Sequence, residues 1–278
     1  AILIAKAKTK PLNPATIQKE FNNIKTRFDS LPEQAPPNFT NIDFWFKPEV
    51  IKQLSKIKAS IEQVKNEDIK DFLKVCFSET TRNVSNTRKG EFKLYRIPEE
   101  KLKVHNPDVL KMFEKIFVKN LGHMNELYSK LKDNSYAKVK IIKQDTRKKN
   151  SIGDEECDFL VSSPPYGDSI TTVAYGQFSR LGSQWLGYDE KEVKDVDKEG
   201  LGGIPTKDLT NSLKSETLAN IISKISEIDK KRVRDVLSFY VDFDKCTDEI
   251  NRIMKKGSKL CFVVGNRTVK KIENERLN

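Results

Sequence analysis

The sequence predicts an α/β fold in which a mainly helical N-terminal region precedes part of a doubly wound (Rossmann-like) sheet. Three observations support this prediction. Apolar residues recur at helical spacing in several stretches of the N-terminal half. After Ala137 the pattern changes to short apolar runs that end on polar residues or glycine, which is typical of strands in a parallel sheet. The chain has 278 residues, which suffices for one core with a substantial insertion.

The N-terminal half is predicted to consist of helices separated by breaks. In chain order the expected elements are a helix over residues 1–28, a proline-rich connector at 31–37, two helices between 48 and 77 with a break near 66–68, a polar loop at 80–90, and a long helix over 109–131. The connector ends the first helix because proline cannot continue one. Asn106-Pro107-Asp108 supplies the start signal for the last helix.

The C-terminal half carries the predicted sheet. In chain order the expected elements are a short strand at residues 139–142, a strand at 159–161, an insertion over about 170–232, a helix from about 234 to 254, and a buried strand at 260–264. Gly257 is expected to cap the helix. The cluster Gly200–Gly203 follows a charged run and no strand, so a flexible hinge is expected there in preference to a phosphate-binding loop.

Composition restricts the class of protein. Lys and Arg number 51 against 40 Asp and Glu, a formal net charge of +11, so the surface should attract polyanions. An AT-rich genome that places lysine at solvated positions explains the excess equally well.

The four cysteines are scattered and there are only two histidines, so we expect reduced thiols and no metal site. No apolar stretch is long enough to cross a bilayer. We expect no membrane partner and a cytoplasmic, prokaryotic, nucleoid-associated protein.

The most informative segment is the run over residues 158–167, in which an apolar strand ends on Ser163-Pro164-Pro165-Tyr166. The prolines fix two φ angles and lack N–H groups, so the loop is stiff and presents carbonyl acceptors. The serine hydroxyl adds an acceptor, and the tyrosine adds a face on which a flat ring can stack. This combination suits an exocyclic amino group on a heterocycle. The alternative is a rigid strand-end turn without chemistry.

Ser163-Pro164-Pro165-Tyr166 resembles the catalytic tetrapeptide of the S-adenosylmethionine-dependent DNA amino-methyltransferases, in the form most often seen in N4-cytosine enzymes. Residues 171–181 and 82–96 resemble segments of a subset of restriction-modification methylases. The resemblance implies S-adenosylmethionine as cofactor, double-stranded DNA as substrate and a cognate restriction endonuclease as partner. It assigns the catalytic role to the four residues of the tetrapeptide.

The resemblance also implies how these residues act. Ser163 Oγ and the Pro164 carbonyl would each accept one N–H of the amine, whose lone pair is otherwise delocalised into the ring. Tyr166 would stack on the base, which must leave the duplex because its amine is inaccessible inside it. Asp145, Ser163 and Gly167 would contact the cofactor, with the Asp145 carboxylate on its adenine amine. The alternative for Asp145 is an ordinary turn cap.

DNA contacts are predicted on both sides of the tetrapeptide. Arg82, Arg88 and Lys89 lie in a stretch of basic, amide and aromatic side chains, and Tyr175 and Arg180 follow the tetrapeptide. A surface loop without a DNA role is the alternative for the first three.

One part of the family pattern does not occur in this sequence. Such methylases hold the cofactor mainly on a strand that ends in an Asp-Pro-Phe-x-Gly-Ser-Gly type loop and on an acidic residue after the next strand. Residues 1–12 resemble the helix that follows that acidic residue. We therefore expect residues 1–30 to continue a missing cofactor-binding segment, residues 31–135 to form a mainly helical region that offers DNA contacts, and residues 136–278 to form the catalytic core.

The sequence thus predicts a site-specific DNA (cytosine-N4) methyltransferase. Two alternatives remain open. The same loop geometry serves N6-adenine methylation. The second alternative is that the chain is a DNA-binding subunit, or half of a split methylase, and has no activity without a missing segment or a second methylase chain.

Overall fold

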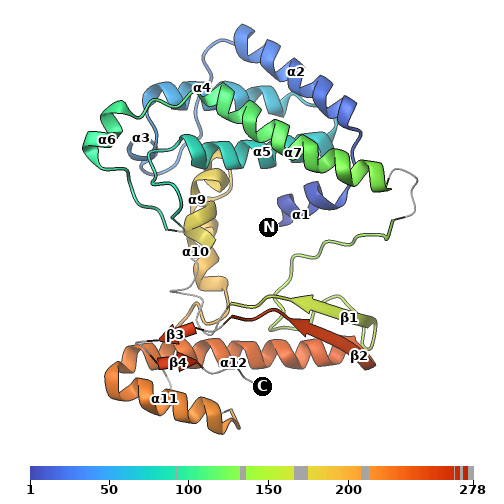
Figure 1. Ribbon diagram of the computed structural model, residues 1–278, viewed down its shortest axis with the longest axis vertical. Coiled ribbons are helices and arrows are strands. Elements are labelled where there is room, and N and C mark those ends of the chain that lie inside the picture. Colours follow the sequence, from blue (N-terminus) through green and yellow to red (C-terminus); the bar gives the residue numbers. More distant parts are fainter. Residues whose placement is uncertain are drawn as a thin grey trace. The chain divides into compact units, whose positions relative to one another are not determined.

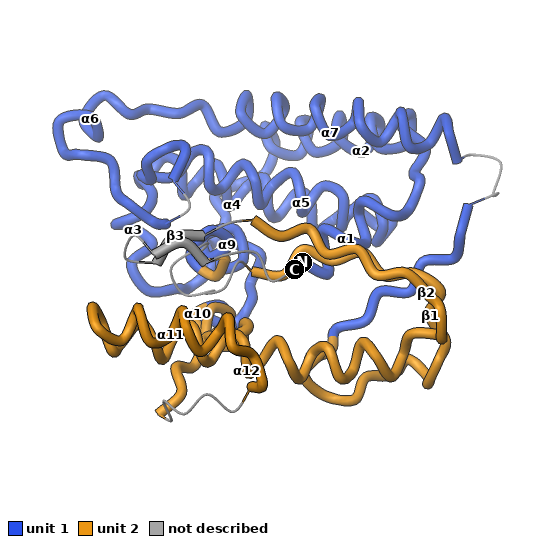
Figure 2. The backbone as a smooth tube through the Cα atoms, turned by 60° about the horizontal axis from the view of Figure 1, so that its bottom comes forward, with its two compact units in different colours: residues 1–143, 177–193 blue, residues 144–176, 194–278 orange. Residues whose placement is uncertain are grey.

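The computed structural model describes residues 1–91, 93–131, 136–165, 175–207, 213–265, 267–269 and 272–274. The chain divides into two compact units (Figure 2). Unit 1 comprises residues 1–143 and 177–193, and unit 2 comprises residues 144–176 and 194–278. Residues 177–193 of the expected insertion therefore belong to unit 1.

Unit 1 is built from helices (Figure 1). In chain order they are α1 (Ile2–Thr9), α2 (Pro14–Ser30), α3 (Ile42–Trp45), α4 (Pro48–Glu62), α5 (Glu67–Val84), α6 (Glu99–Val104), α7 (Val109–Leu131) and most of α9 (Tyr175–Trp185). The break predicted near Asn66 is confirmed, since its side chain accepts hydrogen bonds from Asp68 N and Ile69 N and so caps α5. The proline-rich connector and the long helix α7 are confirmed as well.

Two predicted boundaries in this unit are wrong. The N-terminal stretch is two helices, because Pro14 occupies the first turn of α2 and the Asn13 side chain caps that turn through Ala15 N and Thr16 N. Residues 80–84 are helical, although a loop was expected from position 80. The hydroxyls of Thr80 and Thr81 bond to carbonyls of the preceding turn, so α5 continues through polar residues.

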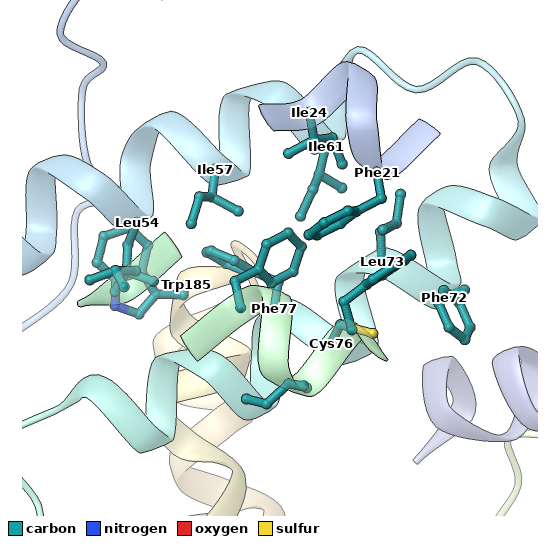
Figure 3. Close-up of a cluster of buried hydrophobic side chains, with 14 of the residues drawn as sticks. Phe21, Ile24, Leu54, Ile57, Ile61, Phe72, Leu73, Cys76, Phe77 and Trp185 are labelled. Atoms are coloured by element: carbon teal, nitrogen blue, oxygen red, sulfur yellow. The ribbon is translucent and has the colours of Figure 1, made fainter. Parts of the chain in front are cut away.

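The core of unit 1 is aromatic and aliphatic and joins α2, α4, α5, α7 and α9 (Figure 3). The rings of Phe21 and Phe117 stack with centroids 3.8 Å apart. Trp185, at the end of α9, is fully buried and makes edge contacts with Phe46 and Phe77. The helix that follows the tetrapeptide is therefore anchored by its last residue.

Unit 2 combines helices with strands. Its described elements are β1 (Cys157–Ser162), the later part of α10 (Glu190–Glu199), α11 (Glu216–Ile228), α12 (Lys230–Ile253), β2 (Met254–Phe262), β3 (Arg267–Val269) and β4 (Ile272–Asn274). β1 pairs in parallel with β2, and β3 pairs with β4 in antiparallel orientation. The described chain is thus mixed α/β and mostly helical, with a two-stranded parallel sheet, which confirms the predicted class in its coarse form.

One face of the β1–β2 sheet is uncovered in the described part of the chain. Leu160 and Phe262 pack on Ile250 and Ile253 of α12. On the opposite face, Phe159 and Val161 are 59% and 63% exposed. We expected a buried strand at residues 260–264, and Leu260 is instead 48% exposed. Parallel sheets normally have both faces covered, so this pair of strands is an incomplete layer.

Two further predictions are wrong, one at the end of the first segment of unit 1 and one in unit 2. Residues 139–142 form no strand, since a strand requires a hydrogen-bonded neighbour and no described segment pairs with them. Gly257 does not cap α12, because the chain passes from Ile253 directly into extended backbone at Met254. Gly257 lies inside β2 with φ of +79°, where the register with β1 shifts.

The glycine cluster after α10 is a tightly packed turn instead of the flexible hinge expected. Gly203 N donates to Gly200 O at 2.9 Å. Gly202 has φ of +66°, and a Cβ there would lie 2.8 Å from Phe239 Cα on α12. A Cβ at Gly203 would overlap the carbonyl oxygen of Asp197. These two glycines are needed because backbone approaches backbone.

Gly202→Ala is therefore expected to destabilise unit 2 by about 1–2 kcal/mol from the left-handed backbone alone, and further through the overlap with α12. Gly200→Ala is the control in the same turn, because its Cβ would meet ordinary contacts of 3.8 Å and longer. Urea unfolding of both variants, followed by circular dichroism, measures the difference. Equal midpoints for the two variants would contradict the packing described here.

Candidate functional site

The first residues of the tetrapeptide lie at the carboxyl end of β1, as predicted. The Ser162 carbonyl accepts a hydrogen bond from Val263 N at 2.9 Å, which extends the ladder with β2 by one residue. The exposed hydroxyl of Ser163 donates to the Val263 carbonyl at 3.0 Å. Because its proton is engaged there, the Ser163 oxygen keeps its lone pairs for an incoming N–H donor.

Pro164 and Pro165 follow as partly buried residues that lack backbone N–H groups. Pro164 can therefore offer a ligand only its carbonyl oxygen, and the Ser163 hydroxyl beside it offers acceptor lone pairs, as an amine requires. Tyr166 and Gly167, predicted to stack on the base and to contact the cofactor, lie outside the described residues.

Asp145 is held by its near neighbour Arg147. Asp145 Oδ1 accepts from the backbone N of Arg147 at 3.0 Å and from Nε at 2.9 Å, and Oδ2 accepts from Nη2 at 2.9 Å. These side-chain bonds lower the pKa of Asp145, so its carboxylate is ionised at neutral pH. The contact to the backbone N is the turn cap that was the alternative for this residue. Its cofactor role stays a prediction.

Arg147 extends this contact into a network within unit 2. Its Nη1 lies 2.9 Å from Asp242 Oδ2 on α12, and its Nη2 donates to the Glu199 carbonyl at the end of α10. Gly202 N donates to the same Asp242 oxygen at 3.1 Å. The network therefore joins the turn at Asp145 to two helices. Asp145 and Arg147 are two positions apart in the sequence, a spacing that could have revealed their bond, whereas nothing local marks Asp242.

The segment between Asp145 and β1 is fixed to α12 by a second network. Glu249 Oε1 accepts from Asn150 N at 2.7 Å and from Arg252 Nη2 at 2.6 Å. Arg252 also pairs with Asp154 and donates to the Ile152 carbonyl at 2.9 Å. The side-chain bond from Arg252 and the backbone bond from Asn150 lower the pKa of Glu249 to about 2.

This depressed pKa predicts acid sensitivity. Glu249 contributes stability that is fully present above its unfolded-state pKa of 4.5 and is lost as the pH falls through the folded-state value of about 2. Glu249→Gln should therefore be less stable than the parent chain at pH 7, and the difference should shrink as the pH is lowered below about 5. Urea midpoints measured across this pH range test the prediction. A difference that does not change with pH would contradict it.

The predicted DNA contacts occupy different settings. Arg82 is on α5, where its Nη1 donates to the Phe178 carbonyl at 2.9 Å, its Nη2 bonds to the Glu91 carbonyl, and its guanidinium lies 4.0 Å from the Phe178 ring centroid. Its guanidinium therefore serves the packing of unit 1. Arg88 and Lys89 are exposed beside Gly90.

Tyr175 and Arg180 both lie on α9, but in different units. Tyr175 is exposed at the start of the helix and belongs to unit 2. Arg180 is partly buried in unit 1, and its Nε finds no partner among the described atoms. The five predicted DNA contacts are thus divided between the two units.

Sequence reasoning missed the acceptor for Ser163. No residue type signals it, because the Val263 atom involved is a backbone carbonyl. Sequence reasoning also missed that Arg88 lies near the Tyr95 ring and Arg96 near the Phe44 ring. The mixture of basic and aromatic residues at 82–96 had pointed to this region without showing these pairs. The described residues contain no cluster of three or more His, Cys, Asp or Glu that could hold a metal ion, and no described helix is long and apolar enough to cross a membrane.

The chain is similar to the Type II methyltransferase M.MvaI of Kocuria varians, to which it is 40% identical over 291 aligned positions. The alignment covers 97% of this chain and 64% of the relative, so the chain spans less than two thirds of that protein's length. No protein-family model matches the sequence. No solved structure matches it either.

Proposed function

We propose that this chain is the catalytic-loop part of a site-specific DNA methyltransferase of a restriction-modification system, which methylates the N4 amine of cytosine. The observation that carries the proposal is the orientation of the Ser163 hydroxyl, whose proton is bonded to the Val263 carbonyl at the end of β2. The 40% identity to a Type II methyltransferase supports it.

In this mechanism the loop activates the amine by hydrogen bonding. Ser163 Oγ and the Pro164 carbonyl each accept one N–H, so the nitrogen lone pair turns out of the plane of the ring. Tyr166 stacks on the base after it has left the duplex. Positioning supplies most of the acceleration, and the proton leaves the amine after methyl transfer without a strong base.

The methyl donor is proposed to be S-adenosylmethionine, which supplies an electrophilic methyl group on a sulfonium. The ionised carboxylate of Asp145 is suited to accept a hydrogen bond from an adenine amine, because its pKa is lowered. Arg147 places two donors on each oxygen of Asp145, so an adenine amine would have to replace one of them, and the 3.2 Å contact from Nε to Oδ2 is the longest of the four. Ser163 and Gly167 are proposed to lie near the sulfonium end.

The open sheet favours a larger assembly. β1 and β2 have no other strand beside them in the described chain, and one face carries exposed Phe159 and Val161. We propose that these strands belong to a doubly wound, Rossmann-like sheet whose remaining strands hold the methionine and ribose of the cofactor. Those strands would lie in a further segment, in cis or in a second methylase chain.

Product analysis tests the proposal. The chain is incubated with duplex DNA and S-adenosylmethionine, alone and with the additional N-terminal sequence of a full-length homologue, and the DNA is digested to nucleosides. N4-methylcytosine is the expected product, formed only with the additional segment. N6-methyladenine would replace the cytosine assignment by the adenine alternative. Unmodified DNA in both reactions would contradict the proposed function.

Calorimetry with S-adenosylmethionine locates the cofactor site. Very weak binding by this chain alone, and tight binding after the additional segment is supplied, is the expected pattern. Micromolar binding by the chain alone would show that its own residues form a complete pocket.

A further inference from the structure

A short hairpin connects α5 to α6 in unit 1 (Figure 1). We name residues 85–97 the arginine hairpin; Phe92 within it lies outside the described residues. Arg88 N donates to Tyr95 O and Ile97 N to Asn86 O, both at 2.8 Å, and Thr87 bridges to Arg96. Paired backbone on both sides of the turn gives the hairpin one defined path.

Contacts to three helices hold the hairpin in place. Asn86 N donates to the Trp45 carbonyl of α3 at 2.7 Å, and Leu94 N donates to Gln177 Oε1 of α9 at 3.3 Å. Arg82 of α5 bonds to the Glu91 carbonyl. The hairpin is thus preorganised, and a ligand would not have to pay for ordering it.

Two of its arginines lie over exposed aromatic rings. The Arg96 guanidinium is 4.4 Å from the Phe44 ring centroid, and the Arg88 guanidinium is 5.9 Å from that of Tyr95. Arg88 Nε also donates to the Arg96 carbonyl, so the two pairs are neighbours. Phe44 and Tyr95 remain 44% and 46% exposed. Each pair therefore presents flat groups to water, which suits stacking with another flat ring.

The surface is also strongly basic. Residues 82–96 contain Arg82, Arg88, Lys89, Lys93 and Arg96 and a single acid, Glu91, so their net charge is 5 − 1 = +4. Arg88, Lys89 and Lys93 are exposed. Exposed cations beside exposed rings match the chemistry of a nucleic-acid strand, which carries phosphates next to bases.

We propose that the arginine hairpin, together with Phe44, contacts DNA at an unstacked base, with Tyr95 stacking on that base and Arg88, Lys89 and Lys93 neutralising the adjacent phosphates. The inference rests on the proposed function for the identity of the polyanion. It adds Phe44, which lies outside the stretch 82–96, and it gives specific roles to Lys93 and Tyr95, which the sequence placed in that stretch without singling them out. Arg82, whose guanidinium bonds within unit 1, is excluded from the contact.

Fluorescence anisotropy of the full chain on two labelled duplexes tests the stacking. One duplex is fully paired, and the other carries a single extrahelical base. The parent chain should prefer the second, and Tyr95→Ala should weaken that complex by about tenfold with little change on the paired duplex. Tyr95→Phe should retain the preference. Tyr188→Ala, at another exposed tyrosine of unit 1, is the control and should bind like the parent chain.

The salt dependence of binding tests the charges. Arg88→Gln and Lys89→Gln should each reduce the slope of log affinity against log salt by about one. Lys111→Gln and Lys115→Gln, two exposed lysines of α7, are matched controls that should leave the slope unchanged.

The outcomes separate this inference from the proposed function. Equal binding by the parent chain and the Tyr95 variant, with unchanged slopes, would overturn the inference and leave the methyltransferase proposal standing. The expected binding pattern, together with unmodified DNA even when the additional segment is supplied, would overturn the methyltransferase proposal and leave the inference standing. A parent chain that binds neither duplex, or that binds an acidic peptide in preference to DNA, would overturn the inference as well.

Discussion

Trp185→Ala should destabilise unit 1 by about 3–5 kcal/mol, which is the usual cost of removing a fully buried aromatic side chain. Trp185 is 0% exposed, and its ring makes edge contacts with Phe39, Phe46 and Phe77 at centroid distances of 6.3, 5.5 and 6.1 Å. Alanine would leave a cavity between these rings that the surrounding helices cannot close. Urea unfolding followed by circular dichroism measures the loss.

Trp185→Phe is the matched control. The indole Nε1 has no hydrogen-bond partner among the described atoms, so phenylalanine removes an unsatisfied buried donor while it keeps most of the packing. The cost should therefore be well below that of alanine. Equal losses for the two variants would show that the site relaxes around any smaller side chain. Because α9 follows the tetrapeptide, the alanine variant should also impair any activity that depends on the position of this helix.

Ser163→Ala should lower the single-turnover rate of methyl transfer by about 10- to 100-fold in a methylation-competent assembly, with DNA affinity nearly unchanged. The substitution removes one of the two proposed acceptors for the amine, a loss of roughly 1–3 kcal/mol in the transition state. Ser162→Ala is the control, because the contact of Ser162 with Val263 uses its backbone carbonyl and survives the change.

Rapid-quench measurement of methylated DNA gives the rate, and anisotropy gives the affinity. A Ser163→Ala assembly with the parent rate would remove the serine from the mechanism. A loss of DNA affinity equal to the loss of rate would instead mean that Ser163 acts in binding.

The long periodic helices were predictable because their apolar faces are encoded locally. The spacing that buries Leu54 and Ile57 on α4, and Phe113 and Phe117 on α7, is visible without knowledge of what packs against them. The failure of residues 139–142 to form a strand was not predictable in the same way, because a strand depends on a neighbour that the local sequence does not specify. The break between α1 and α2 was readable from Asn13-Pro14 and was missed.

The candidate site likewise has some features that the local sequence encodes and others that only the fold creates. The position of Ser163 and Pro164 at a strand end follows from an apolar run that stops at two prolines. The distant partners of Arg147 and Arg82 do not follow from local sequence, because Asp242 and Phe178 lie about 100 positions away and are brought close by the fold. A polar or basic residue chosen for an external role can thus be engaged inside the protein.

The hydrogen bond from Ser163 to the Val263 carbonyl has a consequence for how such sites evolve. The acceptor is present whatever side chain occupies position 263, so the orientation of the hydroxyl is encoded in the path of the backbone after β2. Position 263 can consequently be occupied by any residue that keeps this backbone path. A substitution there requires no compensating change at position 163. Functional coupling between these two loops would be inherited without any covariation between their residues.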